Sequence, residues 1–187
     1  MLKNIVFSCL LALAVVATVN KLIPPSVKPV LTLVLSKNAE QIRQIDQPRQ
    51  ITDTRHLLID RVELNSNNRF KHPTLGVLGW SENFFADIDT QFTVAKKSRY
   101  RFEVGSDDGY QLEIDGKIIC QFQRDRPFQR NTCSHQLSAG QHRLVLRYFQ
   151  GYGNAGLTLK AAPEGVNKLK FWGTKINGVR YLKPSQP

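Results

Sequence analysis

Cysteine, histidine and acidic side chains are scarce in this chain of 187 residues, which holds three cysteines, four histidines and 15 aspartates and glutamates. No C-x-x-C pair and no cysteine–histidine grouping at zinc-ligand spacing occurs, which argues against a zinc site or a thioredoxin-like redox centre. A nucleophile elbow, an H-E-x-x-H helix and a phosphate-binding loop are also missing from the sequence. We therefore expect that the protein is not an enzyme.

The shortage of acidic residues leaves a net charge of +11, because the chain carries 26 lysines and arginines. Such a charge favours an anionic partner, namely acidic polysaccharide, phospholipid head groups or nucleic acid. A solubilising charge without any partner explains it equally well. Hydrophobic residues make up 41% of the chain, which is typical of one globular domain with extensions.

One long apolar run exists, and it lies at the N-terminus. Residues 5–19 read IVFSCLLALAVVATV, after Lys3 and before Lys21. The run is shorter than the roughly 20 residues of a full membrane span, and its length suits the core of a signal peptide. However, no small-x-small cleavage site follows it. We expect residues 1–23 to form an apolar helix that anchors the chain in the cell membrane as a single pass. A cleaved signal and a secreted protein are the alternative.

Both interpretations of residues 1–23 imply export. The rest of the chain would lie outside the cytoplasmic membrane, in the periplasm of a Gram-negative cell, so no nucleic-acid partner is expected. In an oxidising compartment we expect Cys120 and Cys133 to form a disulfide, which would stabilise the fold by roughly 3 kcal/mol. Two free thiols in neighbouring strands are the alternative.

Two flanking segments differ in composition from the middle of the chain. Residues 24–54 begin with prolines, contain one apolar patch at 30–35 and are otherwise polar, which predicts a stalk. Residues 163–187 form a basic C-terminal extension in which Glu164 is the one acidic residue. We expect this extension to pack on the domain rather than to act as a binding arm, because it carries three aromatic residues: Phe171, Trp172 and Tyr181.

Between these segments, residues 55–162 hold several short runs in which apolar and polar side chains alternate. In RYRFEV, for example, Tyr100, Phe102 and Val104 share one face and charged residues share the other. Turn signals separate the runs, namely SDDG, DG, SAG and QGYGNAG. Alternation is typical of antiparallel sheets with one buried face, so we predict an all-β fold, a sandwich or a barrel.

The order of these pieces resembles the PA-14 domain, which is named for anthrax protective antigen and recurs in yeast flocculins and bacterial glycosidases. The stretches that carry the resemblance are RYRFEVGSDDGYQLEIDGKII and HQLSAGQHRLVLRYFQGYGNAGLTL, within residues 80–162. The resemblance implies an antiparallel β-sandwich of the protective-antigen type that commonly binds carbohydrate.

In the glycan-binding members of that family, two adjacent aspartates hold a calcium ion that ligates sugar hydroxyls. Carried over by position, these are Asp107 and Asp108, and the second calcium loop falls near Gln150 and Asn154. We expect Asn154 to be a metal ligand and both residues of this loop to contact the sugar. Tyr152 is a candidate stacking face for a sugar ring, with packing against the sandwich as its alternative.

The residues themselves leave the calcium question open. Calcium takes six to eight oxygen ligands, and two successive carboxylates share an ion only where the backbone is distorted, for instance by a cis peptide bond. Alternatively, Asp107 and Gly109 shape an ordinary turn in which aspartate side chains accept hydrogen bonds from local N–H groups.

A second candidate ligand site is the loop enclosed by the two cysteines. There Arg124 and Arg126 could bind acidic sugars through their forked guanidinium groups, or they could be solvated loop charges. Asp87 and Asp89 share one face of a strand and are expected to be a plain surface pair rather than a metal site.

Two functions fit these observations. The first is a membrane-tethered, lectin-like module that binds a glycan or an acidic polysaccharide, with calcium at Asp107 and Asp108. The second is a non-catalytic accessory or scaffold subunit that docks a partner protein in a cell-envelope assembly, with the aspartates in a structural role.

Overall fold

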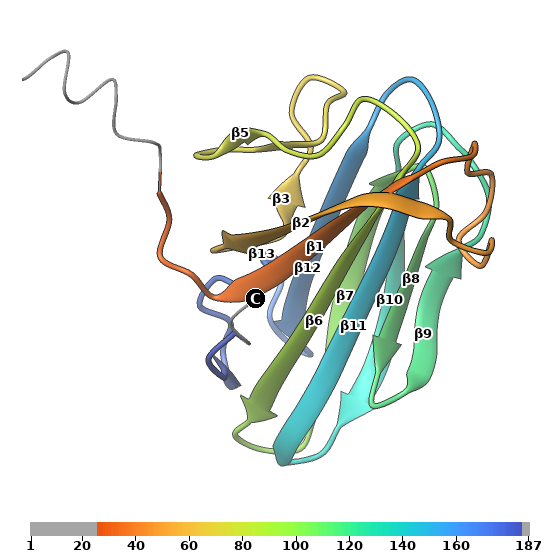
Figure 1. Ribbon diagram of the computed structural model, residues 1–187. Coiled ribbons are helices and arrows are strands. Elements are labelled where there is room, and N and C mark those ends of the chain that lie inside the picture. The colour runs from red at the N-terminus through yellow and green to blue at the C-terminus, as the bar shows by residue number, and fades with distance from the viewer. Residues whose placement is uncertain (1–25, 185–187) are drawn as a thin grey trace, which may run out of the picture.

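The computed structural model describes residues 26–184, and every regular element within them is a β-strand (Figure 1). The apolar helix and anchor expected for residues 1–23 lie outside the described residues. Among residues 26–184 no helix is long and apolar enough to cross a membrane. The prediction of an all-β fold with antiparallel sheets is confirmed.

Two antiparallel sheets form the molecule (Figure 1). The first has seven strands in the order β2-β1-β6-β11-β8-β9, and β14 also pairs with β6. Its strands are β1 (Leu31–Asn38), β2 (Ile51–Ile59), β6 (Phe84–Val94), β8 (Tyr110–Ile114), β9 (Lys117–Phe122), β11 (Gly140–Gln150) and β14 (Val179–Tyr181).

The second sheet has five strands in the order β10-β7-β12-β13, and β3 also pairs with β12. Its strands are β3 (Glu63–Leu64), β7 (Ser98–Asp107), β10 (Gln129–Leu137), β12 (Gly156–Pro163) and β13 (Lys170–Phe171). A small separate hairpin consists of β4 (Lys71–His72) and β5 (Gly76–Val77).

Alternation along the strands places one hydrophobic core between the two sheets. The β7 residues Tyr100, Phe102 and Val104, which were predicted to share a face, are all buried in this core. From the facing sheet, Leu144 and Leu146 of β11 join them. Because successive strand side chains point to opposite faces, the intervening charged residues lie on the outer surfaces.

The stalk predicted for residues 24–54 is wrong from Leu31 onward. Residues Leu31–Asn38 form β1, which lies between β2 and β6, and its apolar patch supplies buried core residues. The polar segment that follows crosses the outer face of the same sheet, where Ile42 and Ile45 pack against Phe85 and Phe149. The segment appears polar in the sequence because these two isoleucines are its only buried apolar side chains in the described structure.

The C-terminal extension also belongs to the sandwich. Trp172 is fully buried, with its ring edge-on to Phe92 at 4.9 Å and to Tyr181 at 5.2 Å between centroids. β14 pairs with β6, and β13 pairs with β12. The packed tail is therefore confirmed, and the range 55–162 predicted for the sandwich domain is too narrow at both ends.

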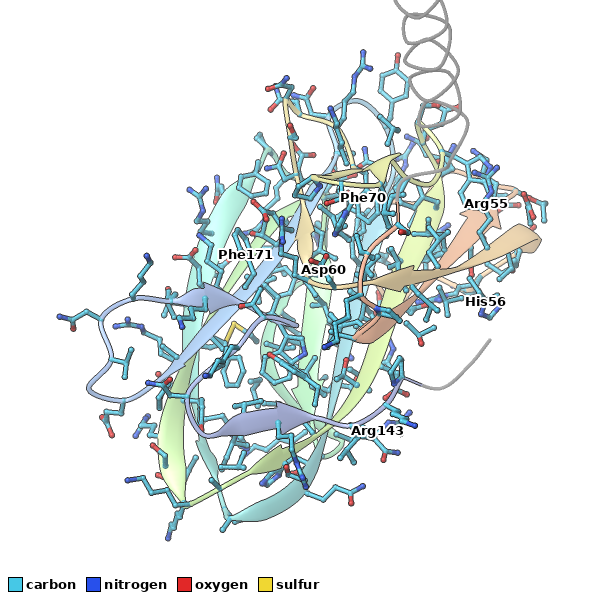
Figure 2. The ribbon with its side chains drawn as sticks, turned by 90° about the vertical axis from the view of Figure 1, so that its left-hand side faces the viewer. Arg55, His56, Asp60, Phe70, Arg143 and Phe171 are labelled. Carbon is cyan, nitrogen blue, oxygen red and sulfur yellow. A yellow bond between two sulfur atoms is a disulfide. The ribbon has the colours of Figure 1, made fainter. Side chains whose placement is uncertain are left out.

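The predicted disulfide is confirmed, and it joins the two sheets. Cys120 lies on β9, the edge of the seven-stranded sheet, and Cys133 lies on β10, the edge of the five-stranded sheet. Their Cα atoms are 6.0 Å apart, and the bond is visible in Figure 2. The disulfide therefore closes one open side of the sandwich.

Candidate functional site

Asp107 and Asp108 lie where the chain passes from the five-stranded sheet to the seven-stranded sheet. Asp107 ends β7 and Asp108 precedes β8. The peptide bond that joins them is cis. Both side chains are nearly enclosed, with exposed fractions of 6% and 5%. The pair therefore sits inside one end of the sandwich rather than on its surface.

Each carboxylate oxygen of Asp108 accepts a hydrogen bond from a neighbouring loop. The backbone N–H of Gly151 donates to Oδ2 at 2.8 Å, and that of Arg126 donates to Oδ1 at 3.3 Å. Gly109 permits this close approach, because a Cβ atom there would lie 2.5 Å from the ring of Phe149. Asp108 thus ties the β9–β10 loop and the β11–β12 loop to the end of β7.

A second chain of polar contacts holds the β11–β12 loop in shape. The buried hydroxyl of Tyr148 contacts the backbone carbonyl of Asp107 and lies 2.6 Å from Oε1 of Gln150. The side-chain N–H of Gln150 then donates to the backbone carbonyl of Asn154 at 2.8 Å. Gln150, which was predicted to contact ligand, is fully buried, and its side chain stabilises the loop from inside.

Burial sets the electrostatics of the aspartate pair. Burial, and next the charge of Asp108, raises the pKa of Asp107 to about 6, although a backbone hydrogen bond from Phe128 and the charge of Arg126 oppose the shift. Burial also raises the pKa of Asp108, against the hydrogen bonds from Gly151 and Arg126. Two carboxylates with raised pKa values in one enclosed place would be stabilised by a nearby cation.

The prediction that Arg126 is a ligand-binding residue disagrees with its position. Its side chain is only 8% exposed, and its guanidinium group donates to Asn131 Oδ1 at 2.6 Å and to Ser106 Oγ at 2.9 Å. The guanidinium carbon also lies 4.2 Å from the ring centre of Phe122. These contacts commit Arg126 to the interior, whereas its neighbour Arg124 is exposed.

A hollow of about 490 Å³ lies beside the β11–β12 loop. Asn154, which is exposed, lines the hollow on the side of the β11–β12 loop. Trp80 lines it from the segment before β6, and Arg55 stacks on the Trp80 ring at 4.3 Å. Further lining residues are Asn67, Asn68, Arg69, Phe70, Val77, Leu78, Gly79, Ser81, Gly153 and Ala155.

Sequence reasoning missed the hollow, because residues 65–83 show no alternation that would place them. One signal was present, since Asn67 and Asn68 are adjacent asparagines and both adopt the left-handed conformation that asparagine tolerates best among residues with a side chain. Tyr152 precedes the lining residues Gly153 and Asn154 in the chain, and its side chain is 78% exposed. Of the two alternatives predicted for Tyr152, the structure therefore shows the exposed ring rather than one packed against the sandwich.

The oxygen donors at the aspartate pair fit a hard cation in type. A carboxylate offers about four acceptor positions, and Asp108 uses two of them for N–H groups. Within residues 26–184 no group of three or more His, Cys, Asp or Glu side chains could hold a metal ion. A calcium ion would therefore rely on these two carboxylates together with amide and carbonyl oxygens, which calcium accepts.

Two other polar clusters of the described chain are structural. Asp87 pairs with Arg49 and Asp89 with Arg143, as expected for a surface pair. His142 resembles part of a catalytic triad, since its Nδ1 lies 2.6 Å from Asp115 Oδ2. However, its Nε2 is 3.0 Å from the backbone carbonyl of Ser138 and 3.5 Å from the hydroxyl, so the carbonyl is the nearer acceptor. The imidazole thus tethers a turn rather than activating a nucleophile.

The sequence matches no protein-family model and no curated protein. The structure, by contrast, is similar to the PA14 sugar-binding domain from an RTX adhesin, with a TM-score of 0.63 and 16% identity over 78% of this chain and 96% of that one. It is also similar to the PA14 domain of the antifreeze protein MpAFP, with a TM-score of 0.62 and 14% identity over 80% and 89% of the two chains.

A third similar structure is the A domain of epithelial adhesin 9 from Candida glabrata, solved in complex with Galb1-3GlcNAc. Its TM-score is 0.58, with 11% identity over 86% of this chain and 94% of that one. At such identities the likeness shows the fold alone, which is the PA14-type β-sandwich that the sequence motifs predicted. It covers nearly the whole of each of these three domains.

Proposed function

We propose that this protein is a lectin-like module that binds a glycan at the end of the sandwich formed by the aspartate pair and the β11–β12 loop. The observation that carries this proposal is the bond from Gly151 to Asp108, which fixes that loop beside the 490 Å³ hollow. Support also comes from the similar folds, of which one is described as sugar-binding and another is in complex with Galb1-3GlcNAc.

The hollow offers the groups that a sugar ring requires. Amide side chains such as those of Asn67 and Asn154 both donate and accept hydrogen bonds, which suits sugar hydroxyls. Trp80 supplies an aromatic surface for the apolar face of a ring, and Tyr152 and Arg124 extend the exposed rim of this end. A site of this size suits a short oligosaccharide or the end of a longer one.

Calcium would sit at Asp107 and Asp108, with Asn154 as a further oxygen donor. When bound, the ion would neutralise the two carboxylates and offer a hard centre for sugar hydroxyls. The protein's own contribution is to hold the two carboxylates next to each other in an enclosed position, where water screens their charge less. Protons compete with the cation for Asp107, whose pKa burial raises to about 6.

We further propose that residues 1–23 tether this module to the cell membrane with the sandwich outside the cytoplasm, or direct its secretion. The Cys120–Cys133 disulfide supports an oxidising compartment. The apolar run at 5–19 supplies the segment that either alternative requires.

A scaffold function has one observation in its favour. β2 is the edge strand of the seven-stranded sheet, and most of its residues are exposed. Figure 2 shows Arg55 and His56 of this strand at the margin of the molecule. An exposed edge of this length could pair with a strand of a partner protein in the cell envelope.

A glycan array probed with and without calcium tests the lectin function. We expect retention on at least one glycan, lost in EDTA and lost in Tyr152→Ala or Asn154→Ala. A matched control is Asn177→Ala, an exposed asparagine beside Tyr100 near the opposite end of β7. No retention under either condition would refute the lectin function, and retention in EDTA would refute the role of calcium.

Calorimetric titration with calcium chloride separates the two functions. The lectin function predicts heat of binding in the wild type and none in Asp108→Asn, together with a higher melting temperature in calcium. The scaffold function predicts no calcium heat, no stabilisation, and array results that do not differ from background.

A further inference from the structure

Basic side chains are distributed unequally over the two outer faces of the sandwich. On the outer face of the seven-stranded sheet, three arginines have a carboxylate partner. Arg143 Nε lies 2.9 Å from Asp89 Oδ1, and Arg49 Nη2 lies 2.9 Å from Asp87 Oδ1. Arg147 pairs with Glu113. These pairs neutralise much of the charge of that face, although Arg180 of β14 contacts the Thr93 hydroxyl rather than a carboxylate.

The five-stranded sheet has fewer carboxylates than cations. Glu103 of β7 is shared by Lys160 at 3.3 Å and Arg130 at 3.7 Å. Arg99 and Arg101, on the same face of β7, have no carboxylate partner within residues 26–184. Part of the net charge of +11 is therefore concentrated beside these two arginines.

A hollow of about 160 Å³ lies between these arginines and the β12–β13 loop. Arg101 Nη2 donates to the backbone carbonyl of Asn167 at 3.1 Å, which fixes the guanidinium at the rim and leaves its other N–H groups available. Ser134 faces Arg101 across the β10–β7 ladder and adds a hydroxyl. Glu164 also lines the hollow and reduces its charge without pairing with either arginine.

From these contacts we propose that Arg99 and Arg101 form a second binding site, which takes the carboxylate groups of an acidic polysaccharide. Forked guanidinium groups bind carboxylates through two parallel hydrogen bonds. The neighbouring hydroxyl and amide groups suit the sugar hydroxyls between successive carboxylates. The site lies on a different face from the aspartate pair and does not depend on the lectin function proposed there.

This assignment replaces the sequence-based one. Arg126 was expected to bind acidic sugars, but its guanidinium group is buried among Ser106, Asn131 and Phe122. Arg99 was not singled out, because alternation along β7 indicates only that it faces outward. Whether such an arginine has a carboxylate partner depends on the neighbouring strands. Here β10 places Gln136 opposite Arg99 and β12 places Ala162 opposite Arg101, while Glu164 bonds to Arg99 through its backbone N–H and makes no ion pair with it in the described structure.

Sodium alginate, a linear polyuronate, and dextran, a neutral glucan, are suitable probes for biolayer interferometry with the full-length protein. We expect alginate binding that weakens as the salt concentration rises from about 0.05 to about 0.5 M. Substitution of Arg99 and Arg101 should not change the dextran signal. Arg99→Gln/Arg101→Gln should weaken alginate binding about tenfold or more. The control Arg43→Gln/Arg180→Gln removes the same charge from exposed positions on the side of the other sheet and should change it less than about twofold.

Three results would overturn the proposal. Equal weakening in both double variants would mean that net charge alone attracts alginate. Tighter binding to phosphatidylglycerol vesicles or to duplex DNA than to alginate would assign the arginines to another partner. Failure of alginate to bind the wild type would remove the site. Asn154→Ala should leave alginate binding unchanged, so a failure of the lectin function would be recognised separately.

Discussion

The backbone N–H of Gly151 donates a hydrogen bond of 2.8 Å to the carboxylate of Asp108, two residues that are 43 positions apart in the chain. The bond connects the β7–β8 turn to the β11–β12 loop, and the second oxygen of Asp108 binds the β9–β10 loop through Arg126. One side chain therefore holds three segments at the end of the sandwich. This role exists in the protein whether or not a cation or a sugar binds.

Replacing Asp108 tests that structural role. Asp108→Ala leaves two buried N–H groups without an acceptor, at a cost of about 1–3 kcal/mol each in the free energy of unfolding. Asp108→Asn keeps one acceptor oxygen and should cost less. Urea denaturation of calcium-free protein measures these changes in the free energy of unfolding. The control is Asp125→Ala, at an exposed position of the β9–β10 loop, which should lower the free energy of unfolding by about 0.5 kcal/mol or less. Equal midpoints for Asp108→Ala and Asp125→Ala would contradict the role.

The raised pKa of Asp107 predicts a pH dependence of stability. Burial, then the charge of Asp108, raises this pKa from 3.8 to about 6 in the folded protein. Between about pH 4 and pH 6 the folded state therefore binds more protons at this site than the unfolded state. The contribution of Asp107 to the free energy of unfolding accordingly falls as pH rises through this window.

Comparison with Asp107→Asn isolates this contribution, because the variant lacks the titrating group. In EDTA, the stability of the wild type relative to the variant should be highest near pH 4 and should decline toward pH 6. Urea midpoints measured at half-unit pH steps would show the trend. A difference that stays constant, or that grows with pH, would mean that Asp107 is not enclosed as the structure places it.

The disulfide allows a quantitative test of the closed side of the sandwich. Cys120 and Cys133 are separated by 13 positions, and closing a loop of this length stabilises a fold by about 3 kcal/mol. Cys120→Ala/Cys133→Ala should lower the melting temperature by about 6–12 °C. Wild-type protein in a thiol reductant should approach the same value. No difference between oxidised and reduced protein would show that the link adds no stability.

Much of the fold follows from local pattern. The alternation in RYRFEV predicts β7, because the polarity of each side chain indicates whether its face of the strand is buried. Tyr100, Phe102 and Val104 are indeed buried. The disulfide and the adjacent aspartates could likewise be found from residue type and motif. Such features need no knowledge of which segments become neighbours.

The missed features depend on neighbours that the sequence does not reveal. Strand β1 was mistaken for a stalk because its apolar patch is short and because the polar segment after it has only two buried apolar side chains, Ile42 and Ile45. The burial of Arg126, a loop residue, depends on acceptors from Ser106 of β7 and Asn131 of β10. Long-range pairing decides such cases, and alternation along one strand does not predict it.

Trp172 tests whether the C-terminal extension is part of the core. Its ring is fully buried and lies edge-on to Phe92 and Tyr181, so Trp172→Ala should lower the free energy of unfolding by about 3–5 kcal/mol. Trp172→Phe should cost less, because it keeps an aromatic ring and removes an indole N–H that has no hydrogen-bond partner in the described structure. Urea denaturation followed by circular dichroism measures both.

Truncation extends the same argument to the domain boundaries. A fragment of residues 55–162 lacks β1, β13, β14 and Trp172, and it exposes the core residues that these elements cover. We expect this fragment to be unfolded. A cooperative transition for the 55–162 fragment would show that the flanking segments are additions to an independent sandwich rather than parts of its core.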